Sequence, residues 1–115
     1  MKQAAGSSLL DVLGVLIAGS SHPSTGLVRE LALSQFGGGP GTDLGSSILA
    51  SACTAAFVNV TASHALDLDD VSYDGMVHAS AVFWPAAWAA AEMVGASGAQ
   101  TLDALTAVVE LHCAL

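Results

Sequence analysis

The sequence predicts an all-α fold of about five helices with no substantial β-sheet. Apolar residues recur at the three- and four-residue spacing of helices along most of the chain. Clusters of glycine and proline divide these stretches into separate segments. No segment shows the strict alternation of apolar and polar residues that marks a half-buried strand. We therefore assign residues 1–115 to a single helical domain.

The first two helices are predicted from apolar periodicity and from the breakers that bound them. A helix over residues 4–19 is indicated by apolar side chains at helical spacing: Leu9, Leu10, Leu13, Leu16 and Ile17. After a short loop, Ser24 or Thr25 can cap a second helix that ends at about Phe36. The glycine-rich run at 37–41 stops this helix. We interpret that run as a turn, because it lacks the lysine and the strand of a phosphate-binding loop.

The third helix is predicted to open at Ser46 or Ser47 and to reach about residue 66. It is rich in alanine and other small residues, a composition that lets helices approach one another closely. The following residues, 67–77, are acidic and include a glycine, so they are predicted to form a loop.

Two more helices complete the predicted fold. One covers residues 80–94 and is ended by Gly95. Ser97 with Gln100 fits a capping box, so a fifth helix is expected from residue 101 to the end of the chain. Three large side chains of the fourth helix are expected to pack in the core: Trp84, Trp88 and Met93.

The composition is poor in charge for a domain of this size. Only 10% of the residues are charged and 53% are apolar, whereas ordinary globular domains have about 25% charged residues. A short chain leaves much of its surface in water. The apolar surplus therefore predicts packing against a second copy, as a homo-oligomer, or against segments outside the chain. The first predicted helix has no clear cap and the last one continues to Leu115, so we expect a partial domain.

The charge balance argues against several classes of partner. The net charge is −8, and Lys2 and Arg29 are the only lysine and arginine. Nucleic acids and anionic membranes require several cationic side chains, so neither is an expected partner. No apolar run reaches the roughly 20 residues that span a bilayer, and no signal-peptide pattern is evident. Cys53 and Cys113 lack the spacing of a disulfide framework, which predicts free, buried thiols and a cytoplasmic location.

One segment, residues 64–80, concentrates the ionisable side chains. It contains four of the ten acidic residues and two of the four histidines. Burying an unpaired carboxylate is costly. This cluster must therefore lie at the surface, pair internally or line a site.

Three interpretations of this segment stay open on its residues alone. It can be a solvated loop between helices. It can bind magnesium or calcium through hard oxygen ligands of Asp69, Asp70 and Asp74, although the spacing matches no complete EF-hand loop. It can also carry general acid/base catalysis, which needs carboxylates and imidazoles that converge on one cleft.

The order of residues in this segment resembles that of a known family. The chain reads His64-Ala-Leu-Asp67-Leu-Asp69-Asp70-Val71, and then His78-Ala79-Ser80. It is similar to the His-Ala-Leu-Asp-Phe-Asp-Asp-Thr and His-Pro-Ser motifs of the MmgE/PrpD family. That family includes 2-methylcitrate dehydratases, cis-aconitate decarboxylases and iminodisuccinate epimerases. The flanking residues 11–19, 85–92 and 95–98 also resemble the family pattern, so the resemblance runs from about residue 8 to 109.

The resemblance implies a helical domain that encloses an active site together with a second, α+β domain. The family breaks a bond beside a carboxylate of a small di- or tricarboxylic acid by acid/base chemistry. It uses no organic cofactor and no iron–sulfur cluster, so no cofactor and no metal are expected here. Carried over to this chain, Asp67 and His78 are the expected catalytic residues. The residues expected to bind substrate are His64, Asp70 and Ser80.

Three departures from the family pattern bear on activity. The Gly-Tyr-Glu commonly found further on in the family is absent, with Leu111-His112-Cys113 near that place. Val71 replaces a threonine and removes a hydroxyl group, and Ala79 replaces a proline after His78. A carboxylate substrate also needs cationic partners, and Lys2 and Arg29 lie far from this segment in the sequence. The chain alone is therefore expected to be inactive, as a fragment of a lyase or isomerase. The alternative is a non-catalytic helical association module with a decayed site.

Overall fold

The computed structural model describes residues 2–73 and 76–114, and 69% of the chain is helical. The predicted all-α class is confirmed: the described residues contain five helices and a single sheet of two very short strands. The elements in chain order are α1 (Lys2–Gly19), α2 (Pro23–Phe36), β1 (Gly41–Thr42), β2 (Leu49–Ala50), α3 (Ala52–His64), α4 (Ala79–Val94) and α5 (Gly98–Ala114).

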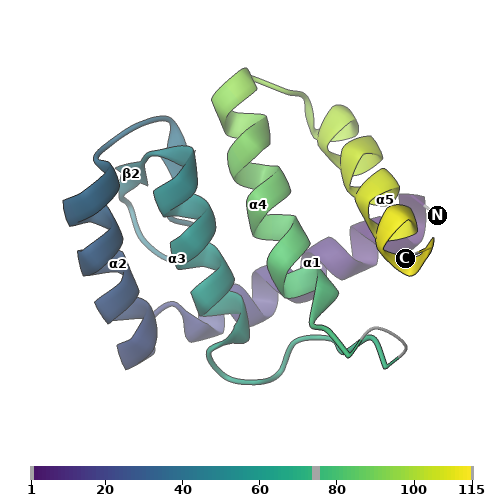
Figure 1. Ribbon diagram of the computed structural model, residues 1–115, viewed down its shortest axis with the longest axis horizontal. Helices are drawn as coiled ribbons and strands as arrows, with labels where there is room; N and C mark the ends of the chain where they lie inside the picture. Colours follow the sequence, from purple (N-terminus) through teal and green to yellow (C-terminus); the bar gives the residue numbers. More distant parts are fainter. Residues whose placement is uncertain (1, 74–75, 115) are drawn as a thin grey trace.

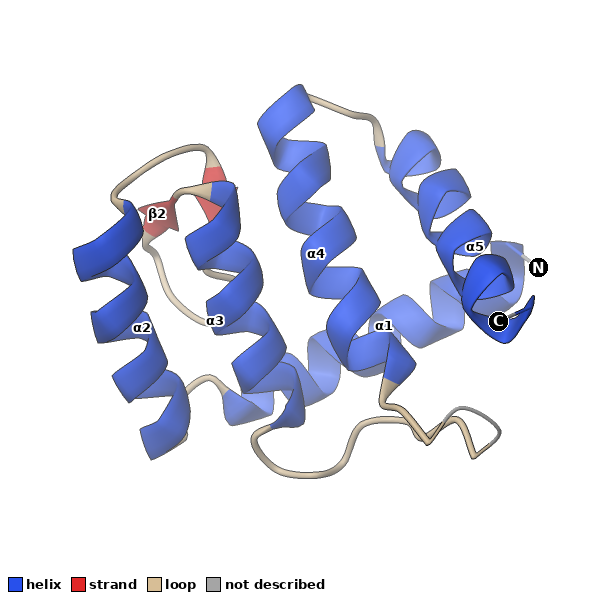
Figure 2. Cartoon of the chain, in the orientation of Figure 1, coloured by secondary structure: helices blue, strands red, loops and turns tan. Residues whose placement is uncertain are grey.

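The helices form two layers. Figure 1 shows α2, α3, α4 and α5 side by side in chain order, with α1 passing behind them. Helix α3 packs against α1, α2 and α4, so it lies at the centre of the molecule. Figure 2 shows the two strands between α2 and α3, and a long loop that joins the end of α3 to the start of α4. This loop brings the two helix ends together on one edge of the molecule.

Local sequence signals set several helix ends. Gly95 adopts a left-handed conformation, with φ of 65°, and ends α4 as predicted. The predicted capping box before α5 is confirmed, since Ser97 N donates to Gln100 Oε1 at 2.8 Å and Gln100 N donates to Ser97 Oγ at 3.3 Å. Helix α2 is capped by His22 instead of the hydroxyl residues that follow it: the Nδ1 atom of His22 accepts the Ser24 N–H at 3.3 Å.

The start of the third helix differs from the prediction. Helix α3 begins at Ala52, with Ser51 as its cap, and not at Ser46 or Ser47. The Ser51 hydroxyl accepts the Thr54 N–H at 3.1 Å. The residues before it form a small antiparallel hairpin from β1 and β2, in which Gly41 lies opposite Ala50 and Thr42 lies opposite Leu49.

Side chains from two helices hold this hairpin in place. The buried Asn59 of α3 donates from Nδ2 to Thr42 O at 2.8 Å and accepts the Leu44 N–H at 3.0 Å. The carboxylate of Glu92 on α4 accepts from the Thr42 N–H at 2.7 Å and from its hydroxyl at 2.6 Å. The hairpin therefore depends on residues that are distant in the sequence.

Two buried regions stabilise the helical layers. One lies where α1, α4 and α5 meet, and its buried residues are Val12, Trp84 and Leu105. The other lies along α3, and its buried residues include Ala55, Val58 and Ala62. Helices α1 and α3 approach so closely that a Cβ atom on Gly19 would lie 2.0 Å from the carbonyl oxygen of Ala62. Only glycine fits at that contact.

Some large apolar side chains lie at the surface, among them Met93, which was expected to pack in the core. Leu10 and Ile17 of α1 are exposed, because α1 contacts the other helices along its opposite side. Met93 is exposed as well, whereas Trp84 is buried as predicted. Cys53 is a free thiol but an exposed one, so the prediction of a buried thiol is wrong there. The side chain of Cys113 lies outside the described residues.

Much apolar surface remains uncovered. Exposed large side chains occur on every helix, and those of α2 and α3 include Leu27, Leu31, Phe36 and Phe57. Among the described residues, no single helix has the length and hydropathy to cross a membrane. The segments Gln3–Gly19 and Pro23–Phe36 meet those criteria only as a pair bent by 91°.

Candidate functional site

The loop between α3 and α4 carries the acidic segment and returns the chain to the start of α4. His64 is the last residue of α3, and His78 is the residue directly before α4. Asp67 has a positive φ of 52°, a conformation that aspartate tolerates better than most side chains. The loop closes through an antiparallel bridge between Ser72 and Val77. The predicted non-helical connection is thus confirmed over its described residues.

Among the described acidic side chains of this loop, Asp69 is the most deeply buried, with 0% of the side chain exposed. Its two carboxylate oxygens lie 3.0 and 3.1 Å from Nδ1 of His64. Oδ2 also lies 3.0 Å from Nδ1 of His78. That second contact is not aligned as a hydrogen bond, and the His78 nitrogen has no hydrogen-bond partner among the described residues. One buried carboxylate therefore lies between two imidazoles.

Four side chains converge around this carboxylate. His64, Asp67, Asp69 and His78 each contribute one potential ligand atom, and these four atoms all lie within 4.8 Å of one another. The imidazole rings of His64 and His78 meet edge to face, with their centres 4.4 Å apart. We call these four residues the His/Asp cluster. The side chain of His64 is 50% exposed and that of His78 is 31% exposed, so solvent reaches both imidazoles.

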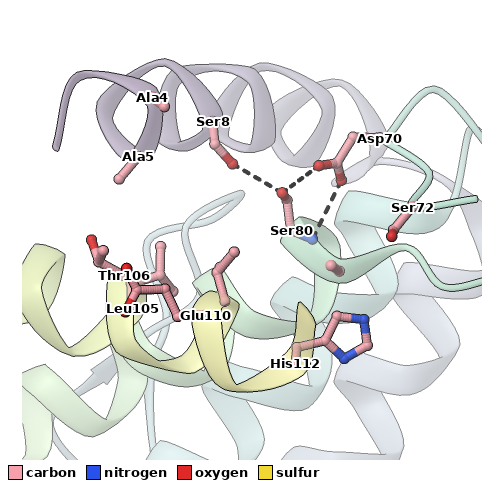
Figure 3. Close-up of a pocket in the computed structure, with 12 residues that line it drawn as sticks. Ala4, Ala5, Ser8, Asp70, Ser72, Ser80, Leu105, Thr106, Glu110 and His112 are labelled. Carbon is pink, nitrogen blue, oxygen red and sulfur yellow. Dashed lines mark hydrogen bonds between the residues drawn. The ribbon is translucent and has the colours of Figure 1, made fainter. Parts of the chain in front are cut away.

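Asp70 and Ser80 form a separate network next to the cluster. The Asp70 carboxylate accepts from the Ser80 N–H at 3.3 Å and from its hydroxyl at 2.5 Å. Ser80 also contacts the Ser8 hydroxyl at 2.9 Å, and Trp84 Nε1 donates to the same Ser8 oxygen at 3.1 Å. Figure 3 shows Ser8 of α1 and Asp70 of the loop pointing toward Ser80 from different elements. The network ties α1 and the loop to the first turn of α4.

A cavity of about 370 Å³ lies beside this network, between α1, α5 and the start of α4. Asp70 and Ser80 line it, with Glu110 and His112 of α5 on its other side (Figure 3). None of the four residues of the His/Asp cluster lines this cavity. The structure therefore divides the predicted site residues into two neighbouring groups: one around Asp69 and one around Ser80.

The lysine or arginine side chain that the structure describes, Arg29, does not reach the cluster. Arg29 is paired with the buried carboxylate of Asp43 and also donates to Ser20 O at 3.3 Å. The side chain of Lys2 lies outside the described residues. Arg29 is therefore committed to a structural ion pair elsewhere in the molecule.

Most of the residues named from sequence do lie close together. Asp67, His78 and His64 meet in the His/Asp cluster. The sequence interpretation considered Asp69 only as an oxygen ligand for magnesium or calcium, although it is the central contact of the cluster. Asp67 and Asp70 lie within two residues of it, so residue type alone could not single it out. Asp74, one of the oxygen ligands considered for a metal, lies outside the described residues.

The arrangement suits proton transfer. An imidazole that donates its Nδ1–H to a carboxylate keeps the lone pair on Nε2 free to accept a proton. The hydrogen-bond geometry at His64 fits this tautomer, which is assigned from its contact with Asp69. A carboxylate at Asp67 and two solvent-accessible imidazoles give the cluster both acidic and basic groups.

Comparison with known proteins gives one match. The MmgE/PrpD N-terminal domain family matches residues 1–115, which is the whole chain. No curated protein and no solved structure matches. The match agrees with the residue order of segment 64–80. The chain therefore belongs to the MmgE/PrpD N-terminal domain family, which is of the dehydratase and lyase type.

Proposed function

We propose that the His/Asp cluster performs general acid/base chemistry on a small di- or tricarboxylic acid, as part of a cofactor-free lyase or isomerase. The observation that carries the proposal is the convergence of two imidazoles and two carboxylates within 4.8 Å in a chain with few charged residues. Such groups, when held together at an accessible position, transfer protons to and from a substrate.

The three main groups take different roles in this proposal. His78 removes or returns the proton at the carbon beside the substrate carboxylate. Asp67, which is exposed, donates or accepts the second proton: at the leaving group in an elimination, or at the reacting carbon in an epimerisation. Asp69 is a positioning residue, because it is buried and contacts both imidazoles. His64 is proposed to contact the substrate from the end of α3. Asp70 and Ser80, which line the adjacent cavity, are proposed to bind the substrate there.

The carboxylates of the substrate require cations that the described residues do not supply at the cluster. Arg29 is paired with Asp43, and the aspartates of the cluster would repel an anion. We therefore place the missing cations on polypeptide that packs against this domain. We also propose that the protein acts in the cytoplasm. Exposed apolar side chains on α2 and α3 support such packing, either with further segments or with a second copy in a homodimer.

The test uses the full natural protein and a panel of small di- and tricarboxylic acids, including 2-methylcitrate and cis-aconitate. His78→Ala and Asp67→Asn should each lower turnover by about 10²-fold or more, as loss of a general acid or base does. Asp11→Asn changes charge equally at an exposed position of α1 and should leave turnover unchanged.

The uncovered apolar surface also favours a second candidate, a non-catalytic association module. The same assay separates the two. The acid/base proposal would be contradicted if the full protein converted none of the acids in the panel, or if the His78→Ala variant kept near-normal turnover. Either result would favour the association module.

A further inference from the structure

The carboxylate of Asp69 lacks the permanent cation that a buried carboxylate normally has. Its side chain is fully buried, and the described residues that contact it with polar atoms are His64 and His78. A buried charge must be neutralised by a partner or by a bound cation. Two imidazoles neutralise it only if they carry a proton, whereas a metal ion would neutralise it directly.

The His78 imidazole gives a second, independent indication. Its Nδ1 atom is buried and has no hydrogen-bond partner among the described residues, although it points at Asp69 from 3.0 Å. Buried polar atoms of this kind are normally satisfied. The Nδ1 atom of His78 and the Asp69 oxygen face one another at a distance that two ligands of a common cation also have.

The donor set and its spacing fit one class of ion. Two imidazoles and two carboxylates match Zn²⁺ and related divalent transition metals, whereas Mg²⁺ and Ca²⁺ prefer oxygen ligands alone. Neighbouring ligand atoms in a tetrahedral zinc site lie roughly 3.3 Å apart, as bond lengths of about 2.0–2.1 Å require. The contacts at 3.0–3.1 Å between Asp69 and the imidazoles already have this spacing. All four ligand atoms lie within 4.8 Å of one another, so small side-chain rotations would close the site.

We propose that His64, Asp67, Asp69 and His78 bind one divalent transition-metal ion of the Zn²⁺ class. Asp69 is the buried anchor of this site, and Asp67 closes it from the solvent side. This inference goes beyond the acid/base function. An ion bound through the Nδ1 atoms would replace the His64–Asp69 hydrogen bond that leaves Nε2 free to accept a proton, so the metal acts as an inhibitor of that function. The two proposals can therefore fail separately.

The test is a metal titration of the full chain after removal of metals by a chelator. Co²⁺ serves as the spectroscopic probe, since its visible absorption is strong in a four-coordinate site. We expect one equivalent of Co²⁺ to develop this absorption and one equivalent of Zn²⁺ to abolish it. An equal concentration of Mg²⁺ should not compete. Binding of Zn²⁺ is measured in parallel by calorimetry.

Two variants test the ligands. His64→Ala removes a half-exposed side chain and should fold normally, while Asp69→Asn keeps the shape of the buried anchor; circular dichroism checks both. Each should weaken Zn²⁺ binding by more than the roughly 10- to 100-fold that follows loss of an outer-shell partner. The matched controls are Asp11→Asn and His22→Asn, the second of which keeps a capping acceptor at the start of α2. Unchanged Zn²⁺ affinity in a folded His64→Ala or Asp69→Asn variant, or no four-coordinate Co²⁺ spectrum with the parent chain, would overturn the proposal.

Discussion

Asp43 and Asp69 are both buried carboxylates, but they are neutralised in different ways. Their side chains are 4% and 0% exposed. Asp43 is paired with the guanidinium of Arg29, between the hairpin and α2. Asp69 lies between the imidazoles of His64 and His78, beyond the C-terminal end of α3.

The difference separates a structural ion pair from a reactive one. A guanidinium keeps its charge under all ordinary conditions, so Arg29 can only stabilise the fold around Asp43. An imidazole can hold a proton, release it or bind a metal ion. The charge of the site around Asp69 can therefore change during function. The charge of the pair between Asp43 and Arg29 stays fixed.

The largest effect is expected at the structural pair. Asp43→Asn leaves the guanidinium of Arg29 partly buried without its counter-charge. Breaking a buried pair in this way costs about 3–5 kcal/mol of unfolding free energy. Urea unfolding followed by circular dichroism measures the loss, with the exposed Asp11→Asn as the control. A loss no larger than that of the control would show that the pair is not structural.

The same substitution at the other carboxylate should cost less. Asp69→Asn also removes a buried charge, but its partners His64 and His78 are not permanently charged side chains, unlike Arg29. The expected loss of unfolding free energy is about 1.5–3 kcal/mol, the contribution of a hydrogen bond to a charged group. The measurement is again urea unfolding, at the same pH as for Asp43→Asn. If Asp69→Asn proved the more destabilising of the two, the distinction between the pairs would be wrong.

The smallest effect is expected from removing one imidazole. Half of the His64 side chain lies in solvent, and Asp69 keeps its contact with His78. His64→Ala should therefore change the unfolding free energy by less than about 1 kcal/mol, as for exposed ion pairs. A larger loss in the same urea experiment would mean that His64 has a structural role comparable to that of Arg29.

The fold followed from the sequence where local signals decide it. Gly95 and the Ser97–Gln100 capping box act within a few residues, so the end of α4 and the cap before α5 could be read directly, although α5 begins at Gly98 and not at residue 101. The start of α3 could not be read in this way. The hairpin before it is held by Asn59 and Glu92, which lie far along the chain from the residues they bind. No local sequence pattern predicts contacts between residues so far apart in the chain.

The candidate site was predictable in part for a similar reason. A loop between two helices returns the chain, so the meeting of His64 with His78 and Asp67 could be expected from their positions at its ends. The inward direction of Asp69 could not be expected. It depends on the backbone path of the loop, including the positive φ of Asp67, and Asp70, next in sequence, points to Ser80 instead.

The contact between Gly19 and Ala62 has a consequence for the cluster. Ala62 lies two residues before His64 on α3, and the backbone of α1 touches its carbonyl oxygen with no side chain between them. A close-packed contact transmits displacement because it has no slack to absorb it. The contact with helix α1 therefore fixes the position of the last turn of α3. A tilt of α1, such as one caused by binding at its exposed side, would displace the end of α3 and with it the imidazole of His64.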